Sequence, residues 1–349
     1  FCLSRGLGDV YKRQEQWKVP REVLDSHYLL LIAFLQPHIQ EELEQRFLFP
    51  KYDVYTRYAF AHREDYRESG LSVAPPEVMC YFVRPKRKLL EEFIEEISEG
   101  NGRELREEWY EDELVYRNSY IINQTYYASL GEKKAFVLSH GKNLAVFKLV
   151  GYAEQVVDYY RLGEICAHGW IAHQRYPTKG KVWHPGGAHP FIGLHEALVH
   201  NGDFANYTGV CTYLAQRGIA PLFLTDTEVS VLLFDLWKRT YGYPLEWVLE
   251  ALAPTTERDF ALLPEEKKEV YSRIQISHIG GSPDGPWFFI ILRFEPEGNE
   301  VQLIGITDTS MLRPQVFAYH SGEISVGMIA SEKQALDAFL ESLHREYSC

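Results

Sequence analysis

Several features that would place the chain in a broad class are missing from its sequence. The longest apolar run extends only from Tyr28 to Leu35, whereas a membrane-spanning helix needs about 18 or more apolar residues in succession. We therefore expect no membrane partner. Basic residues are outnumbered, with 36 Lys and Arg against 49 Asp and Glu and a net charge of −13. An acidic chain without a basic stripe argues against a nucleic-acid partner.

Cysteine is scarce. The five cysteines are an odd number and lie far apart in the sequence: Cys2, Cys80, Cys166, Cys211 and Cys349. This usage favours the reducing cytoplasm and offers neither a disulfide framework nor a zinc site. The histidines of the central region also lack a recognised metal-ligand spacing, so we expect no bound metal and a structural role for each of them: His173, His184 and His189.

Core-forming residues, in contrast, are plentiful. The 349 residues are 46% hydrophobic and 14% aromatic, which is ample for a large buried core. Residues 1–14 lack clear periodicity and resemble a non-native leader, so we exclude them from the fold. We expect residues 15–349 to form one domain, truncated at its N-terminus. The sequence has neither an internal repeat nor a low-complexity linker.

The apolar pattern alternates between strand-like and helix-like segments. We expect helices at 88–99, with Gly100 as C-terminal cap, from about Asp226, at 244–252, and after Ser331. The rest of the stretch from 54 to 109 is acidic and irregular, and 254–277 suggests a charged surface excursion. Expected strands are 134–139 and 144–150 as a hairpin, 171–174, 196–200, 287–294, 301–306, 315–319 and 324–329. Strand-rich ends around central helices favour an α+β fold.

Four polar clusters interrupt the apolar segments between residues 171 and 228. Polar residues with Gly or Pro at strand ends are typical of loops that carry a site. Taken singly, the clusters also have plain structural interpretations, since Asn201-Gly202 is a strong hairpin-turn dipeptide and Thr225 with Glu228 matches a capping box. In order, the clusters are Arg175-Tyr-Pro-Thr178, Gly187-Ala-His-Pro190, Val199-His-Asn-Gly202 and Thr225-Asp-Thr-Glu228.

In this order, the clusters resemble class II glutamine amidotransferases, which are N-terminal nucleophile hydrolases that release ammonia from glutamine. The resemblance is closest to the amidotransferase domain, or subunit, of archaeal-type glutamate synthases. It implies the fold of that superfamily, an α+β four-layer αββα sandwich. Other segments that carry it are Ser139-His-Gly-Lys-Asn143, Asp284-Gly-Pro286, Met311-Leu-Arg-Pro314 and Ala330-Ser-Glu332.

The resemblance implies a role for each matching residue. Arg175 would hold the α-carboxylate of glutamine through two parallel hydrogen bonds, and Asp226 would receive the α-ammonium group. Asn201 and Gly202 would form the oxyanion hole, through a side-chain amide and a backbone N–H. Thr178 and His200 would also contribute to the substrate pocket, His200 by shaping the strand end rather than by acting as a base.

The nucleophile of this family is an N-terminal cysteine whose own α-amine is thought to act as the base. A thiol with a free pKa of about 8.5 needs such a base nearby. Cys2 follows Phe1, so its amine is part of a peptide bond unless Phe1 is removed. We expect that the true nucleophile lies upstream, with Cys2 as the alternative. Cys166 and His168 share a face if they lie in a strand, but we interpret Cys166 as a small buried hydrophobe.

The resemblance therefore predicts an enzyme that hydrolyses L-glutamine to glutamate through a γ-glutamyl thioester and supplies ammonia to a synthase. No cofactor is expected in this chain, and FMN and an iron–sulfur cluster would belong to the partner synthase chain. One alternative is an amidotransferase subunit that serves another acceptor, as in methylamine-dependent glutamate synthesis. The other is a catalytically inactive domain that binds an amino acid or a partner.

Overall fold

The computed structural model describes residues 2–4, 17–101, 105–174, 184–295, 298, 300–312, 314–322 and 325–347. These residues combine helices with antiparallel strands, which confirms the α+β class. The chain divides into two compact units. The first comprises Phe1–Ala197, Pro221–Glu228 and Leu292–Gln302, and the second comprises Leu198–Ala220, Val229–Ile291 and Leu303–Cys349.

The largest sheet of the first unit has four strands in the order β3-β4-β2-β5. They are β2 (Tyr28–Phe34), β3 (Tyr52–Ala59), β4 (Glu77–Pro85) and β5 (Ala135–Ser139). Strand β2 is buried at every position and pairs antiparallel with both β4 and β5. Its continuous apolar sequence is typical of a strand covered on both faces.

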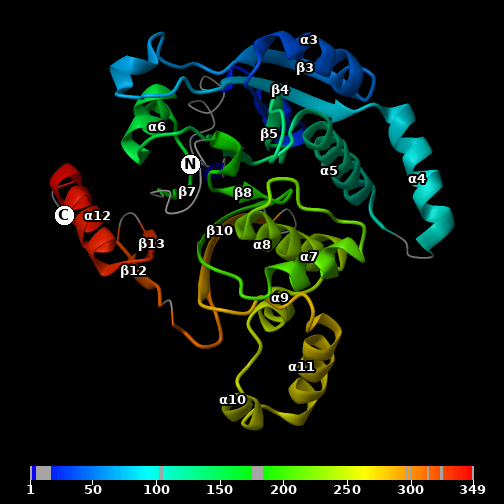
Figure 1. Cartoon of the computed structure of the whole chain (residues 1–349), viewed down its shortest axis with the longest axis vertical. Helices are drawn as coiled ribbons and strands as arrows, with labels where there is room; N and C mark the ends of the chain where they lie inside the picture. Colours follow the sequence, from blue (N-terminus) through cyan, green and yellow to red (C-terminus); the bar gives the residue numbers. More distant parts are fainter. Residues whose placement is uncertain are drawn as a thin grey trace. The chain divides into compact units, whose positions relative to one another are not determined.

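Helices cover this sheet. Helix α5 (Glu107–Tyr126) packs on β4 and β5 and against α4 (Arg87–Asn101) (Figure 1). Alternate side chains of β2 enter one apolar cluster together with Val115 and Ile122 of α5. The shorter helical segments of the unit are α2 (Arg21–Ser26), η1 (Pro37–Ile39), α3 (Gln40–Leu43), η2 (Glu44–Leu48), η3 (Tyr66–Ser69), α6 (Ala153–Tyr159), η4 (Leu162–Glu164) and η5 (Pro185–Gly187).

A second sheet in this unit has the order β6-β1-β7. Its strands are β1 (Cys2–Ser4), β6 (Leu144–Val146) and β7 (Gly169–Ile171), and β1 is antiparallel to both neighbours. The predicted hairpin at 134–150 is therefore wrong. The segment from His140 to Asn143 carries the chain from one sheet to another, so β5 pairs with β2 and β6 pairs with β1.

Strands β8 (Phe191–Ile192), β9 (Glu196–Gly202), β10 (Trp287–Glu295) and β11 (Glu300–Thr307) form a sheet in the order β11-β10-β9-β8. The boundary between the two units falls within β9, within β10 and within β11. Asn201-Gly202 does not form the hairpin turn that the dipeptide favours. Strand β9 continues through Gly202, and the next element is helix α7 (Tyr207–Ala215).

The second unit is mainly helical. Helix α8 (Asp226–Asp235), whose first turn belongs to the first unit, continues as the π-helix η6 (Leu236–Thr240). Helices α9 (Leu245–Leu252) and α11 (Glu265–His278) pack together, and α10 (Glu257–Ala261) connects them (Figure 1). Strands β12 (Val316–His320) and β13 (Val326–Ala330) form an antiparallel pair that α12 (Lys333–Tyr347) contacts.

Some local predictions fail in the described chain. The stretch from 54 to 109 is not irregular, because β3 and β4 occupy much of it and β4 contains a buried run from Val78 to Val83. Helix α4 runs through Gly100 to Asn101 rather than ending there. The expected apolar face of α12 stays partly exposed at Phe339 and Leu340. Among the described helices, none is both long and apolar enough to cross a membrane.

Candidate functional site

The start of helix α8 displays the Thr-Asp-Thr-Glu cluster. Thr225 caps the helix as predicted, because its Oγ1 accepts the Glu228 N–H at 3.1 Å. The side chain of Glu228 turns to the preceding loop. Its Oε1 accepts the N–H of Leu222 at 2.6 Å, and its Oε2 accepts those of Phe223 at 2.7 Å and Leu224 at 3.1 Å. One buried carboxylate thus binds three consecutive backbone donors just before the helix.

The structure brings this cluster together with the Gly-Ala-His-Pro cluster. The hydroxyl of Thr227 lies 2.7 Å from Nε2 of His189, and both side chains are buried. The His189 ring also lies 4.1 Å from that of His173, centroid to centroid. Asp226 is partly exposed, and its Oδ1 accepts the Thr227 N–H at 2.9 Å. The cluster therefore contributes a buried contact through Thr227 and a more accessible carboxylate through Asp226.

A buried lysine lies in the same region and was not predicted. Lys148 is only 5% exposed, and its ammonium group lies 3.9 Å from the ring centroid of Phe191 and 5.8 Å from that of Phe223. Aromatic faces of this kind attract a cation. Burial lowers the pKa of Lys148 to about 7, against the opposing effect of Glu228. The sequence signal is a lone charged residue in the otherwise apolar run 144–150.

The pKa of Glu228 is shifted in the opposite direction to that of Lys148. Burial raises its pKa to about 7, although the three backbone N–H groups and Lys148 all favour the charged form. His184 lies in this region as well, with its ring 5.5 Å from Tyr127. Burial and the positive charges of Lys133 and Lys148 lower the pKa of His184 to about 4, so this histidine is neutral at pH 7. Within the described residues, no group of three or more His, Cys, Asp or Glu side chains could hold a metal.

Asn201 and Gly202 end strand β9 in the second unit. Gly202 has φ +132°, and a Cβ added there would lie 2.1 Å from the carbonyl oxygen of Pro286 and 2.6 Å from Cα of Trp287. A side chain is excluded by backbone, so only glycine fits. The Asp203 N–H donates to the same Pro286 carbonyl at 3.3 Å. The Asp-Gly-Pro segment that ends at Pro286 thus supports the backbone at the expected oxyanion hole.

His200 precedes this pair and is 2% exposed. Its ring lies 5.3 Å from Phe204 and 5.5 Å from Phe289, centroid to centroid. These contacts embed the imidazole among the aromatic side chains of the second unit. A packing role at the strand end accounts for this environment.

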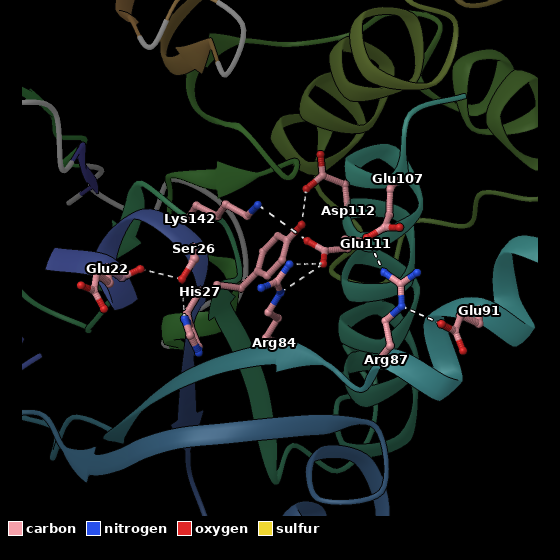
Figure 2. A network of polar contacts seen from close by, with 11 residues as sticks. Glu22, Ser26, His27, Arg84, Arg87, Glu91, Glu107, Glu111, Asp112 and Lys142 are labelled. Carbon is pink, nitrogen blue, oxygen red and sulfur yellow. Dashed lines mark hydrogen bonds and ion pairs between the residues drawn. The ribbon is translucent and has the colours of Figure 1, made fainter. Parts of the chain in front are cut away.

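In the first unit, α5 holds the chain that leads into β9. His195 Nε2 lies 2.8 Å from Oδ2 of Asp112, and the Tyr28 hydroxyl donates to Oδ1 at 2.6 Å. Figure 2 shows Asp112 beside Glu111, which forms ion pairs with Arg84 and Lys142. Burial alone would raise the pKa of Asp112, but His195 and the hydrogen bond from Tyr28 hold it below its ordinary value.

The remaining predicted residues are placed only in part. Arg175 and Thr178 lie outside the described residues. The backbone of Cys2 lies between β6 and β7, opposite Val146 and Ile171. Cys166 is exposed rather than buried, because it lies in the irregular segment between η4 and β7.

Comparison with known proteins finds no family model that matches the chain. The chain is 32% identical over 276 residues, or 79% of its length, to an uncharacterised protein of Archaeoglobus fulgidus, and covers 65% of that relative. It is 32% identical over 184 residues, half of its length, to the glutamine–fructose-6-phosphate aminotransferase (isomerizing) of Campylobacter jejuni. A shorter match, 39% over 100 residues, is to the Helicobacter pylori protein of the same name.

These matches cover less than two thirds of each relative, with 28% of the Campylobacter protein and 17% of the Helicobacter protein aligned. The chain therefore has partial homology, over about half of its length, to a class II glutamine amidotransferase.

Proposed function

We propose that the chain is the glutamine-hydrolysing part of a class II glutamine amidotransferase, with the αββα sandwich of N-terminal nucleophile hydrolases. The observation that carries the proposal is the 184-residue similarity to glutamine–fructose-6-phosphate aminotransferase. The local geometry supports it. Asp226 offers a partly exposed carboxylate at the start of α8, and Gly202 offers a backbone position where no side chain fits.

In the proposed reaction, the thiolate of a cysteine attacks the side-chain amide carbon of L-glutamine. The Asn201 amide and the Gly202 N–H stabilise the oxyanion that forms. The C–N bond then breaks, and the nitrogen takes up a proton and leaves as ammonia. Water cleaves the thioester to release glutamate and restore the thiol. Arg175 and Asp226 hold the carboxylate and the ammonium group of the amino acid.

A glutaminase assay on the native full-length protein, with its mature N-terminus verified by mass, tests this proposal. We expect Asn201→Ala to lower kcat by roughly a hundredfold, since one oxyanion donor is lost. Asp226→Asn should raise KM for glutamine by about tenfold, as expected for the loss of one charge-assisted contact. The matched control is Asp53→Asn, because Asp53 lies on an exposed position of β3. Wild-type protein that neither binds nor hydrolyses glutamine would refute the proposal.

The nucleophile requires its own variant. Cys2→Ser abolishes hydrolysis if Cys2 acts once its amine is free, and leaves it intact if a cysteine upstream acts instead. Native protein with a verified mature N-terminus that shows no hydrolysis would favour the binding-only alternative. In that case the protein would still bind glutamine and would release no ammonia.

The ammonia acceptor is a further part of the proposal. We favour a glutamate synthase-type partner that carries FMN and an iron–sulfur cluster, on the basis of the sequence motifs that run from Ser139 to Glu332. The name of the Campylobacter relative suggests fructose 6-phosphate as a second candidate acceptor. The native assembly should be assayed for glutamate formed from 2-oxoglutarate and for amination of fructose 6-phosphate. Methylglutamate formed from methylamine would indicate the remaining alternative.

A further inference from the structure

We propose that Glu228 is a positioning residue, which orients the substrate-binding carboxylate of Asp226 by fixing the backbone of Leu222–Leu224. This inference rests on the proposed function, because it takes Asp226 as the group that receives the ammonium of the substrate. We call Glu228 and the three N–H groups that it binds the loop clasp. All of its residues belong to the first unit.

The backbone at the end of the clasp is strained. Leu224 has φ +57°, a left-handed conformation that a branched side chain rarely adopts. Its side chain is 51% exposed, so core packing does not account for this conformation. A strained residue persists where its surroundings hold it, and such residues gather at functional sites. Leu224 directly precedes the cap Thr225, and Asp226 follows the cap.

The carboxylate of Glu228 supplies the restraint on the N–H side of the loop. Three consecutive N–H groups converge on its two oxygens at 2.6–3.1 Å. Hydrogen bonds to a charged acceptor are stronger than neutral ones, and burial strengthens them further. Glu228 is itself held in the first turn of α8, where its own N–H donates to Thr225. The clasp therefore closes on the same turn that carries Asp226.

Other contacts hold the opposite side of the loop. The Phe223 ring lies 4.4 Å from that of Tyr127 and 5.5 Å from that of Phe191. The Leu222 carbonyl accepts the hydroxyl of Ser129 at 2.9 Å. These contacts fix where the loop lies but leave the direction of its N–H groups to Glu228. Loss of the carboxylate should therefore release the left-handed turn while the loop stays docked.

Asp226 depends on this turn for its orientation. Its Oδ1 accepts the N–H of Thr227 in the first turn of the helix, so any shift in where the helix begins redirects the carboxylate. Loss of this orientation should weaken the contact between Asp226 and the ammonium group of the ligand. The contacts that the protein makes with the rest of the ligand should not change. A ligand without an ammonium group thus provides an internal reference.

The experiment compares L-glutamine with 4-carbamoylbutanoate, which lacks the α-ammonium group, by isothermal titration calorimetry. The nucleophilic cysteine is replaced by alanine in every protein compared, so that glutamine binds without being hydrolysed. The quantity of interest is the ratio of the two Kd values. We expect wild-type protein to prefer glutamine and Asp226→Asn to remove most of that preference. Glu228→Gln should reduce it by about tenfold, because an amide cannot accept from both sides of the clasp. The matched control is Glu250→Gln.

Glu250 is a suitable control because it is equally buried and accepts a backbone N–H, that of Thr255, at 3.0 Å. It lies on α9 in the second unit. Glu250→Gln should leave the ratio unchanged, even if it lowers stability. Amide hydrogen exchange at 222–224 should accelerate in Glu228→Gln and stay slow in the control. If Glu228→Gln fails to fold, the double variant Leu224→Gly/Glu228→Gln replaces it, because glycine adopts the left-handed conformation without strain and the clasp is still lost.

A wild-type ratio in Glu228→Gln, or in Leu224→Gly/Glu228→Gln if the first variant does not fold, overturns the positioning role. Unchanged exchange at 222–224 in Glu228→Gln overturns the clasp itself. Failure of the proposed function gives a different result, since wild-type protein would then not prefer glutamine and Asp226→Asn would have no effect. If Asp226→Asn lowers the preference for glutamine but Glu228→Gln does not, the glutamine site is still supported. Only the positioning role of Glu228 is then refuted.

Discussion

Replacement of Lys148 by methionine should make the protein more stable in acid and reveal the buried charge through its pH dependence. Burial lowers the pKa of Lys148 from 10.5 to about 7, a difference of about 3.5 units. At about 1.4 kcal/mol per unit, the charged form of this lysine destabilises the folded state by up to about 5 kcal/mol. Methionine has a similar length and removes the charge.

The sign of the effect follows from proton binding. Below pH 7, Lys148 is charged in both states, and the folded state bears the full destabilisation. Between pH 7 and 10.5 the unfolded chain holds more protons, so wild-type stability rises with pH. Glu228 affects stability at lower pH. Its raised pKa makes the stability of the folded state fall as the pH rises from about 4.5 to about 7. The advantage of Lys148→Met should therefore be largest below pH 7 and decline above it.

Lys148→Met also removes two favourable interactions, which reduces the expected gain in stability. Methionine cannot make the cation–π contacts with Phe191 and Phe223, which contribute roughly 1–2 kcal/mol when desolvated. It also leaves Glu228 without its positive neighbour. Replacing a buried charge with an apolar side chain is often neutral or stabilising by about 1–4 kcal/mol. We therefore expect Lys148→Met to gain about 2 kcal/mol at pH 6.

Urea unfolding at pH values from 5 to 10 measures this gain. The control is Lys88→Met, because the Lys88 side chain is 89% exposed on α4 and should not change the pH profile. A stability difference between wild type and Lys148→Met that stays constant from pH 6 to 10 would refute the reasoning. It would mean that Lys148 stays charged in the folded state and that its surroundings offset the free-energy cost of burying this charge.

Three further substitutions test the local geometry. Gly202→Ala should destabilise the protein by about 3 kcal/mol or more in urea unfolding, since its Cβ would lie 2.1 Å from the Pro286 oxygen. Gly209→Ala, where an added Cβ meets nothing within 4 Å, should instead be neutral or stabilise α7 by up to about 1 kcal/mol. Thr225→Ala should lower stability by about 1 kcal/mol through loss of the helix cap, and an unchanged unfolding midpoint would contradict that.

The elements that could be predicted from the sequence are those whose signal is local. Strand β9 and helix α8 follow from an apolar run and a cap, and the last four strands lie within about two residues of the expected bounds. The hairpin at 134–150 failed because pairing is not local. The alternation of side chains identifies a strand but not its partner, and β5 and β6 pair with strands more than a hundred residues away.

The candidate site shows the same limit. Gly202 could be singled out from the sequence, but the reason that it must be glycine lies in the Pro286–Trp287 backbone, more than eighty residues further along. Lys148 was visible as a lone charge in an apolar run, yet only the fold shows that aromatic rings surround it. Arg175 and Thr178 lie outside the described residues, so their roles stay predictions.

The Thr-Asp-Thr-Glu cluster illustrates why a structural motif and a functional one need not be alternatives. A capping box would use Glu228 to close its own helix, but here the carboxylate binds the loop before the cap. Burial shifts the pKa values of both Glu228 and Lys148 to about 7. Keeping these two groups buried therefore lowers stability near neutral pH. An apolar pair would avoid that cost but could not bind three backbone N–H groups. The burial of Glu228 is therefore best explained by the loop whose N–H groups it binds and, under the proposed positioning role, by the orientation of Asp226.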